Sequence, residues 1–167
     1  MQNLLTLSKM DEADLNLPMQ NFDLGELVRE SAAPFEEPAR EKRQSLSVEA
    51  PEIAVKANRD SMGQLVGILL DNAVKYTPEG GEISVTVSRE GNSVILREQN
   101  TIDPKDVEDN PERLFDRFYR RDEARTQKKG GYGIGLSAAR AIAAANGAQI
   151  SAAYREQNIV FTVKLMV

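Results

Sequence analysis

Residues 68–77 read ILLDNAVKYT and close the strongest helical pattern of the chain, which runs from Arg59 to Thr77. Apolar residues recur there every three or four positions, which places them on one wide face. Three polar residues, Asn72, Lys75 and Tyr76, are spaced i, i+3 and i+4 and therefore share a second stripe. An amide, an ammonium group and an aromatic ring suit a magnesium ion, a phosphate and a base. For these three residues alone, a solvated helix face is the simpler interpretation.

A second unusual segment, residues 130–136 (GGYGIGL), leads directly into another helical pattern. Closely spaced glycines let backbone amides approach an anion, and a helix start adds a favourable dipole. A flexible turn before a helix gives the same pattern. No Gly-Lys-Ser/Thr follows, which excludes a Walker A loop, and the charged segment before the glycines disfavours a Rossmann fingerprint.

Between these two segments, residues 113–121 read RLFDRFYRR. Phe115 and Phe118 fit the core side of a short amphipathic helix at about 111–118. The arginines make this region basic within a chain of net charge −5, and such local charge suits the binding of a triphosphate. The charged, glycine-ended segment from Arg120 to Gly131 is expected to be a mobile loop.

The composition limits the chemistry that is open to the chain. Its 167 residues contain neither cysteine nor histidine, which excludes disulfides, thiolate sites and the commonest general base. A bound metal is then a hard cation with oxygen ligands, and magnesium is the leading candidate. The negative net charge disfavours nucleic acid as a partner. Without a membrane-length apolar run or a signal peptide, the chain is expected to be soluble and cytoplasmic, although its parent protein could be anchored in the cell membrane.

The remaining patterns predict a two-layer α/β sandwich. Asp23 begins a capping box with Glu26, and Pro34 and Pro38 interrupt the helix that follows. Strand patterns occupy residues 45–48, 53–55, 82–89, 93–99, 150–155 and 159–166. A further helix is expected at about 135–146, closed by a glycine. This order predicts a mixed, mostly antiparallel sheet with helices on one face.

Taken together and in this order, the three segments resemble the catalytic and ATP-binding domain of bacterial sensor histidine kinases, in the wider group that includes gyrase, Hsp90 and the mismatch-repair ATPases. Residues 69–77 resemble the N box of that family, residues 114–120 its F box and residues 131–136 its G2 box. The resemblance covers about Asp23 to the C-terminus. It implies the Bergerat fold, the histidine-kinase ATPase sandwich.

The N-terminal segment adds to this resemblance. Residues 4–11 (LLTLSKMD) resemble the end of the second dimerisation helix of the family. We therefore expect residues 1–20 to be a remnant of that helix with a linker, and residues 21–167 to form the ATP-binding domain.

The resemblance also implies roles for single residues. Asn72 would bind Mg²⁺, Lys75 would contact phosphate and Tyr76 would pack near the adenine of ATP, which makes Asn72 and Lys75 the implied catalytic pair. Further nucleotide contacts would come from Asn100, Ile102, Arg120, Gly131, Tyr132, Gly133, Ile134, Gly135 and Leu136. The segment from Arg120 to Gly130 would be the ATP lid, with the glycines as its hinge.

Two positions depart from the family pattern. Many members have an additional Asn four residues before Asn72, and the hydrolysing relatives have a glutamate there that activates water, but this chain has Ile68. Hydrolysis is therefore disfavoured, and transfer to another group is left as the chemistry. The G1 box is also eroded to EQNTID at residues 98–103, where Asn100 aligns with the adenine-reading Asp. A loop residue after a strand explains Asn100 equally well.

The implied function is that of a protein-histidine kinase of two-component signal transduction. It binds ATP·Mg²⁺ and presents the γ-phosphate to a histidine on a separate dimerisation domain, largely through positioning and charge neutralisation. The implied partners are this phosphoacceptor domain of the same parent protein and a cognate response regulator. A homodimeric parent and a monomeric fragment are expected.

Three alternatives stay open at this stage. A serine-kinase anti-sigma factor shares the fold but is disfavoured by residues 4–11. A pseudokinase without nucleotide is compatible with the eroded G1 box. A stand-alone ATPase is disfavoured by Ile68.

Overall fold

The computed structural model of the protein describes residues 17–116 and 135–166. The helices are α2 (Leu24–Ala32), α3 (Glu36–Glu41), α4 (Arg59–Tyr76) and α6 (Gly135–Ala145), with the 3₁₀ helices η1 (Ala33–Phe35), η2 (Pro104–Asp106) and η3 (Pro111–Phe115). The strands are β1 (Gln20–Asp23), β2 (Ser45–Glu49), β3 (Ala54–Ala57), β4 (Glu82–Glu90), β5 (Ser93–Thr101), β6 (Ala148–Arg155) and β7 (Asn158–Met166).

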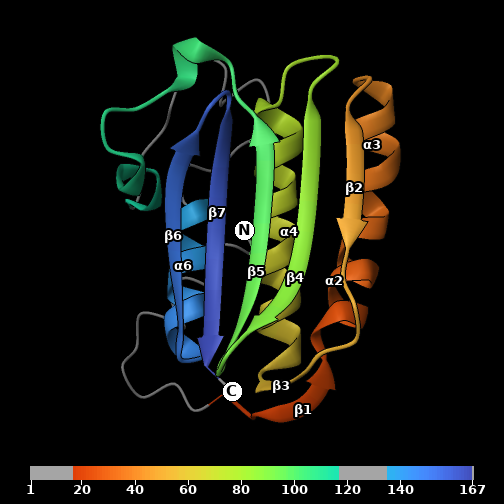
Figure 1. The fold of residues 1–167 in the computed structure, drawn as a ribbon, viewed down its shortest axis with the longest axis vertical. Coiled ribbons are helices and arrows are strands. Elements are labelled where there is room, and N and C mark those ends of the chain that lie inside the picture. Colours follow the sequence, from red (N-terminus) through yellow and green to blue (C-terminus); the bar gives the residue numbers. More distant parts are fainter. Residues whose placement is uncertain (1–16, 117–134, 167) are drawn as a thin grey trace.

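Five strands form one mixed sheet in the order β2-β4-β5-β7-β6. Strand β2 runs parallel to β4, and the other neighbours are antiparallel. The helices cover the face of the sheet that points away from the viewer in Figure 1. The sequence prediction of a two-layer sandwich with a mostly antiparallel sheet is confirmed.

The hydrophobic core lies between the sheet and α4. Leu65 and Leu69 of α4 are fully buried, as are Leu96 of β5 and Phe161 of β7. Each such side chain contributes roughly 1.5–3 kcal/mol when it is removed from water. Because strand side chains alternate between faces, Asn100 points to the same helix-covered side of β5 as Leu96.

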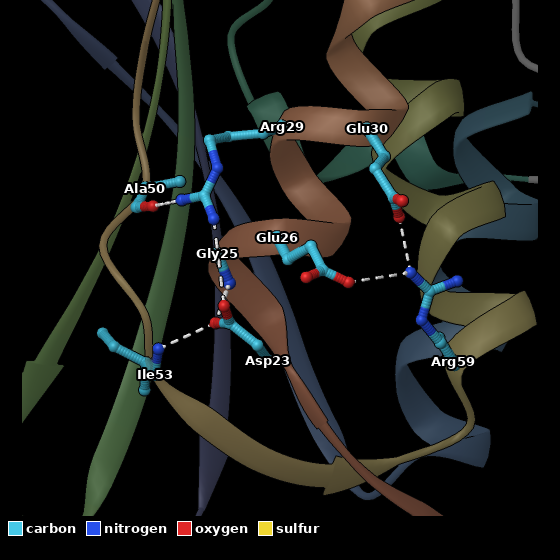
Figure 2. A network of polar contacts seen from close by, with 8 residues as sticks. All are labelled: Asp23, Gly25, Glu26, Arg29, Glu30, Ala50, Ile53 and Arg59. Atoms are coloured by element: carbon cyan, nitrogen blue, oxygen red, sulfur yellow. Dashed lines mark hydrogen bonds and ion pairs between the residues drawn. The ribbon is translucent and has the colours of Figure 1, made fainter.

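A two-stranded sheet of β1 and β3 was not predicted. The strand pattern near residue 53 belongs to this small sheet and not to the main one. Asp23 ends β1 and begins α2, since its Oδ1 accepts hydrogen bonds from the amides of Gly25 (3.0 Å) and Ile53 (2.9 Å) (Figure 2). The capping role that the sequence predicted for Asp23 is confirmed, and the same oxygen also holds the chain that leads into β3.

Charged side chains of α2 join this helix to its neighbours (Figure 2). Arg29 donates to the carbonyl of Ala50 in the connection between β2 and β3. Arg59, the first residue of α4, pairs with Glu26 (3.7 Å) and Glu30 on α2. These side chains are largely exposed, so each pair stabilises the fold only modestly.

The helix expected at 111–118 is a 3₁₀ helix that ends at Phe115, within the part of the chain that the structure describes.

Among the described residues, no helix combines the length and the apolarity needed to cross a lipid bilayer.

Candidate functional site

The C-terminal ends of α4 and β5 both lie at the upper end of the molecule in Figure 1. Helix α6 begins lower, beside the middle of α4. The predicted site residues that the structure describes all lie in or beside these three segments. The fold therefore brings the N box and the remnant of the G1 box to one end of the molecule, with the start of the G2 helix beside the N-box helix.

The stripe predicted on α4 is present and half-buried. Lys75 forms an ion pair with Asp71, one turn earlier, at 2.9 Å. The Nδ2 atom of Asn72 is buried and has no hydrogen-bond partner among the described residues. An amide with an unsatisfied buried atom is costly in a helix unless a ligand completes its hydrogen bonds. Asn72 is therefore chemically suited to contact a ligand, whereas a solvated helix face would leave its side chain in water.

The C-terminal end of α4 is held by the turn before β2. Gln44 is 7% exposed, and its Nε2 donates to the carbonyls of Val74 (3.0 Å) and Thr77 (2.7 Å). Lys42 also donates to the carbonyl of Val74. A cation and an amide donor at a helix C-terminus satisfy carbonyls that have no partner within the helix. This support for the helix end that carries Lys75 was not predicted.

Asn100 lies inside strand β5 and is fully buried, paired across the sheet with Ile83 and Ile159. The interpretation of Asn100 as a loop residue after a strand is therefore wrong: the ladder continues to Thr101 because β4 and β7 both extend alongside. The Nδ2 of Asn100 donates to the carbonyl of Thr101 at 3.0 Å. Its Oδ1 is buried and has no partner in the described segments, so it is an available acceptor.

Ile102 follows directly and belongs to the hydrophobic core, with 4% of its surface exposed. Its amide donates to the carbonyl of Gln157 in the turn between β6 and β7, at 2.9 Å. These contacts fix the chain immediately after Asn100. Nothing in them assigns Ile102 a ligand contact of its own, and its nucleotide-binding role stays a prediction.

The first residues of α6 pack against the middle of α4. A Cβ atom at Gly135 would lie 3.8 Å from Cγ2 of Ile68, and Ala138 also packs against Ile68. Leu136 is half-buried against the main core. Ile68 therefore fills the contact between the two helices, where a carboxylate would be needed to activate water.

The other predicted nucleotide contacts lie outside the described residues. These are Arg120, Gly131, Tyr132, Gly133 and Ile134. The segment from Arg120 to Gly130 that was interpreted as an ATP lid also lies there. Their assignment rests on the sequence alone.

The F-box segment is anchored at the edge of the sheet. Glu112 accepts a hydrogen bond from the amide of Ala152 on β6 at 2.9 Å and lies 4.0 Å from Arg140 on α6. The guanidinium of Arg140 stacks over Phe115 at 5.5 Å, and Phe115 meets Phe161 edge-on at 5.9 Å. The prediction that Phe115 is a core residue is confirmed.

A separate polar cavity of 310 Å³ lies on the sheet face opposite the helices. Its lining includes Ser45, Ser47, Glu82, Ser84, Gln99 and Thr101. Because it lies across the sheet from Asn72 and Asn100, we do not assign it to the same site. Within the described residues, no group of three or more Asp or Glu side chains is arranged to hold a metal ion.

The family model "Histidine kinase-, DNA gyrase B-, and HSP90-like ATPase" matches residues 57–167. The chain belongs to this family. As a member of this ATPase family it is an ATP-binding domain, and the match includes α4, β5 and α6 with all the residues assigned to the site above.

The curated relatives of the chain are sensor kinases. The probable sensor protein PcoS of Escherichia coli is 34% identical over 164 residues, which are 98% of this chain and 35% of PcoS. The sensor histidine kinase WalK of Bacillus subtilis is 32% identical over 157 residues, 89% of this chain and 24% of WalK. The chain thus spans only about a third or less of the length of these relatives.

The solved structures agree with these relatives. The catalytic domain of histidine kinase ThkA has a TM-score of 0.78 at 29% identity, over 90% of this chain and 96% of that domain. ThkA in complex with the response regulator protein TrrA matches with a TM-score of 0.77 at 26% identity, over 99% of this chain and 47% of that one. The recognition of a histidine-kinase ATPase domain from three ordered motifs is confirmed.

Proposed function

We propose that this chain binds ATP with Mg²⁺ between the C-terminal ends of α4 and β5 and the start of α6, and that it presents the γ-phosphate to a histidine on a phosphoacceptor domain of its parent protein. The observation that supports this most directly is that two side-chain amides, Asn72 on α4 and Asn100 on β5, each have a buried atom without a hydrogen-bond partner among the described residues. Each of these amides suits one part of a magnesium nucleotide.

Asn72 would bind Mg²⁺ through its carbonyl oxygen, which leaves its Nδ2 to a phosphate oxygen or water. Lys75 would exchange its ion pair with Asp71 for a phosphate, since both side chains are on the accessible stripe of α4. Tyr76 would lie along the base, and Asn100 would accept from the adenine amine. When bound, the magnesium ion neutralises phosphate charge.

The acceptor must be supplied from outside this chain. The sequence has no histidine, so the chain cannot label itself on that residue. Ile68 offers no base to activate water, which favours transfer over hydrolysis. The relatives named sensor histidine kinases support a protein-histidine kinase as the parent enzyme.

The partners follow from the same relatives. We infer that residues 1–20 join the domain to a dimerisation helix of the parent, which would be a homodimer. The ThkA complex with the response regulator TrrA supports a response regulator as the protein that receives the phosphoryl group next.

The test is a calorimetric titration of the chain with ATP, with and without Mg²⁺. Asn72→Ala should abolish the magnesium dependence and weaken ATP binding at least tenfold, on the order of 1.4 kcal/mol or more. Asn92→Ala, in the exposed turn between β4 and β5, is the matched control and should bind as the unsubstituted chain does. Equal magnesium-dependent binding by Asn72→Ala contradicts the assignment, and no ATP binding by the unsubstituted chain favours the pseudokinase alternative.

A further inference from the structure

Three segments far apart in the sequence meet at the end of the molecule opposite the proposed nucleotide site. They are residues 18–23, which lead into and form β1 (the entering chain), the N-terminal end of α4 and the C-terminal end of α6. Asn146, just after α6, is 6% exposed, and its Oδ1 accepts a hydrogen bond from the amide of Asn58 at 2.7 Å. Its Nδ2 donates to Oγ of Ser61 (3.0 Å) and to the carbonyl of Ile142 (2.9 Å).

The side chain of Asn58 joins this cluster to the entering chain. Its Oδ1 accepts from the amide of Ser61 at 2.9 Å and so caps α4, whereas its Nδ2 donates to the carbonyl of Pro18 at 2.9 Å. The next residue, Arg59, donates its amide to Oε1 of Gln20 at 3.1 Å. The two ends of the Asn58 amide thus have separate partners, one on α4 and one on the entering chain.

A helix cap needs only the Oδ1 atom of Asn58. The Nδ2 bond is additional, and it is part-buried: Asn58 is 7% exposed, whereas Pro18 lies at the surface. Strand β1 pairs with β3 from Gln20, opposite Ala57, to Asp23, so the entering chain is also bound through this strand pair. The entering chain is therefore fixed to the start of α4 by side chains as well as by a strand pair.

Both helices of this cluster lead to the nucleotide site. The other end of α4 carries Asn72 and Lys75, and α6 begins at Gly135 beside Ile68. The helices are antiparallel neighbours that are in contact near both ends of α6, at Asn146 and where Ala138 packs against Ile68. Because packed helices move as stiff units, a change in their relative position at one end is passed to the other.

We propose that Asn58 is a positioning residue that couples the docking of residues 18–23 to the geometry of the nucleotide site. The inference rests on the proposed function, because it takes the site to lie between α4 and α6. Docking of the entering chain holds Asn58, and Asn58 with Asn146 sets where α4 lies against α6. Coupling between sites is reciprocal, so nucleotide binding must in turn strengthen the docking of residues 18–23.

The decisive variant is Asn58→Asp in the full 167-residue chain. The carboxylate keeps an acceptor for the Ser61 amide and remains a good helix cap, but it places an oxygen where Nδ2 donated to Pro18. We expect ATP affinity to fall about fivefold, at the low end of typical coupling between sites. Amide exchange of residues 20–23 should slow on ATP binding in the unsubstituted chain and become insensitive to ATP in Asn58→Asp.

Two further variants make the test specific. Gln20→Ala removes the hydrogen bond that the Arg59 amide donates to the entering chain, but it leaves the Asn58 cap of α4 in place. It should also weaken the slowing of amide exchange that ATP causes in residues 20–23. Asn92→Asp adds the same charge in an exposed turn and should change neither ATP affinity nor exchange. If Asn58→Asp does not fold, Gln20→Ala carries the test alone.

A purely structural role for Asn58 predicts a lower melting temperature with unchanged ATP affinity and an unchanged exchange response. That result overturns the coupling while it leaves the proposed function intact. Failure of the unsubstituted chain to bind ATP overturns both. ATP binding that leaves the exchange of residues 20–23 unaffected in the unsubstituted chain overturns the coupling alone.

Discussion

The side-chain amide of Asn100 donates from Nδ2 to the main-chain carbonyl of Thr101 at 3.0 Å, and this bond fixes which end of the amide is available to a ligand. The free atom is Oδ1, an acceptor. An acceptor matches the amine of adenine, whereas guanine presents a carbonyl at the same position. A neutral amide that rotated could offer its NH₂ to that carbonyl. Rotation in this structure breaks the bond to Thr101.

We therefore expect the chain to prefer ATP to GTP, and Asn100→Ala to reduce this preference about fivefold, the scale of one hydrogen bond. Asn100→Asp should keep the preference for ATP but unfold at lower temperature, because its carboxylate faces the carbonyl of Thr101. The measurement is competition of the two nucleotides for each variant.

Asp103→Asn serves as the control for base reading. The Asp103 side chain already accepts a hydrogen bond from the amide of Lys105 at 3.1 Å and caps η2. Its substitution should leave the ratio of ATP to GTP affinity unchanged. Selective loss of ATP binding in Asp103→Asn would instead mean that Asp103, in the loop after β5, contacts the adenine in place of Asn100.

A second prediction concerns the fate of the γ-phosphate. With labelled ATP and Mg²⁺, the chain alone should show neither phosphohistidine nor appreciable phosphate release, because it has no histidine and Ile68 supplies no base. A separate domain that carries the acceptor histidine should restore slow labelling when it is added at high concentration, since the covalent tether is missing. Rapid phosphate release by the chain alone would favour a stand-alone ATPase.

Local patterns were sufficient to predict the elements that carry the site. The helix that ends at Tyr76 and the cap at Asp23 follow from periodicity and capping within a few residues of sequence. The position of Gly147 after α6 is also local, since its φ of 71° favours glycine. The three-motif resemblance then identified the ATPase fold.

The contacts that hold these elements in place are long-range, and no local pattern indicates them. Gln44 reaches the carbonyl of Val74, 30 residues away, and Asn146 reaches the amide of Asn58, 88 residues away. Asn100 was partly misread for the same reason. A strand continues wherever its neighbours extend beside it, and neighbours are known only from the sheet.

The third prediction tests the support of the N-box helix. In Gln44→Glu, a carboxylate of nearly the same shape replaces the amide that donates to the carbonyls of Val74 and Thr77. Two hydrogen bonds are lost, and a negative charge is placed at the negative end of the α4 dipole. We expect destabilisation by about 2 kcal/mol in urea unfolding, together with weaker ATP binding through displacement of Lys75.

Gln64→Glu makes the same chemical change at an exposed position of α4. It should alter stability by less than about 0.5 kcal/mol, as surface substitutions usually do. If Gln44→Glu behaved like Gln64→Glu, the hydrogen bonds to the end of α4 would have no measurable role.

The last prediction compares two glycines within helices. A Cβ atom at Gly25 would lie 2.1 Å from the carbonyl oxygen of Pro51 and 2.7 Å from that of Ala50. Both are main-chain atoms in the connection between β2 and β3, which cannot turn aside as a side chain can. Gly25→Ala should therefore push α2 away from this connection and lengthen the bond between the Gly25 amide and Asp23. Overpacking of this kind destabilises by about 1–3 kcal/mol or more.

Gly67 in α4 provides the opposite case, since no atom of the other described residues lies within 4 Å of its Cβ position, apart from its chain neighbours and the nearby backbone of its own helix. Gly67→Ala should stabilise the chain by roughly 0.5–1 kcal/mol through the higher helix propensity of alanine. Urea unfolding of both variants measures the two effects. We expect them to have opposite signs and to differ by about 1.5 kcal/mol or more. Equal stabilisation by both substitutions would mean that the β2–β3 connection yields freely, and that the close approach at Gly25 does not fix α2 against the sheet.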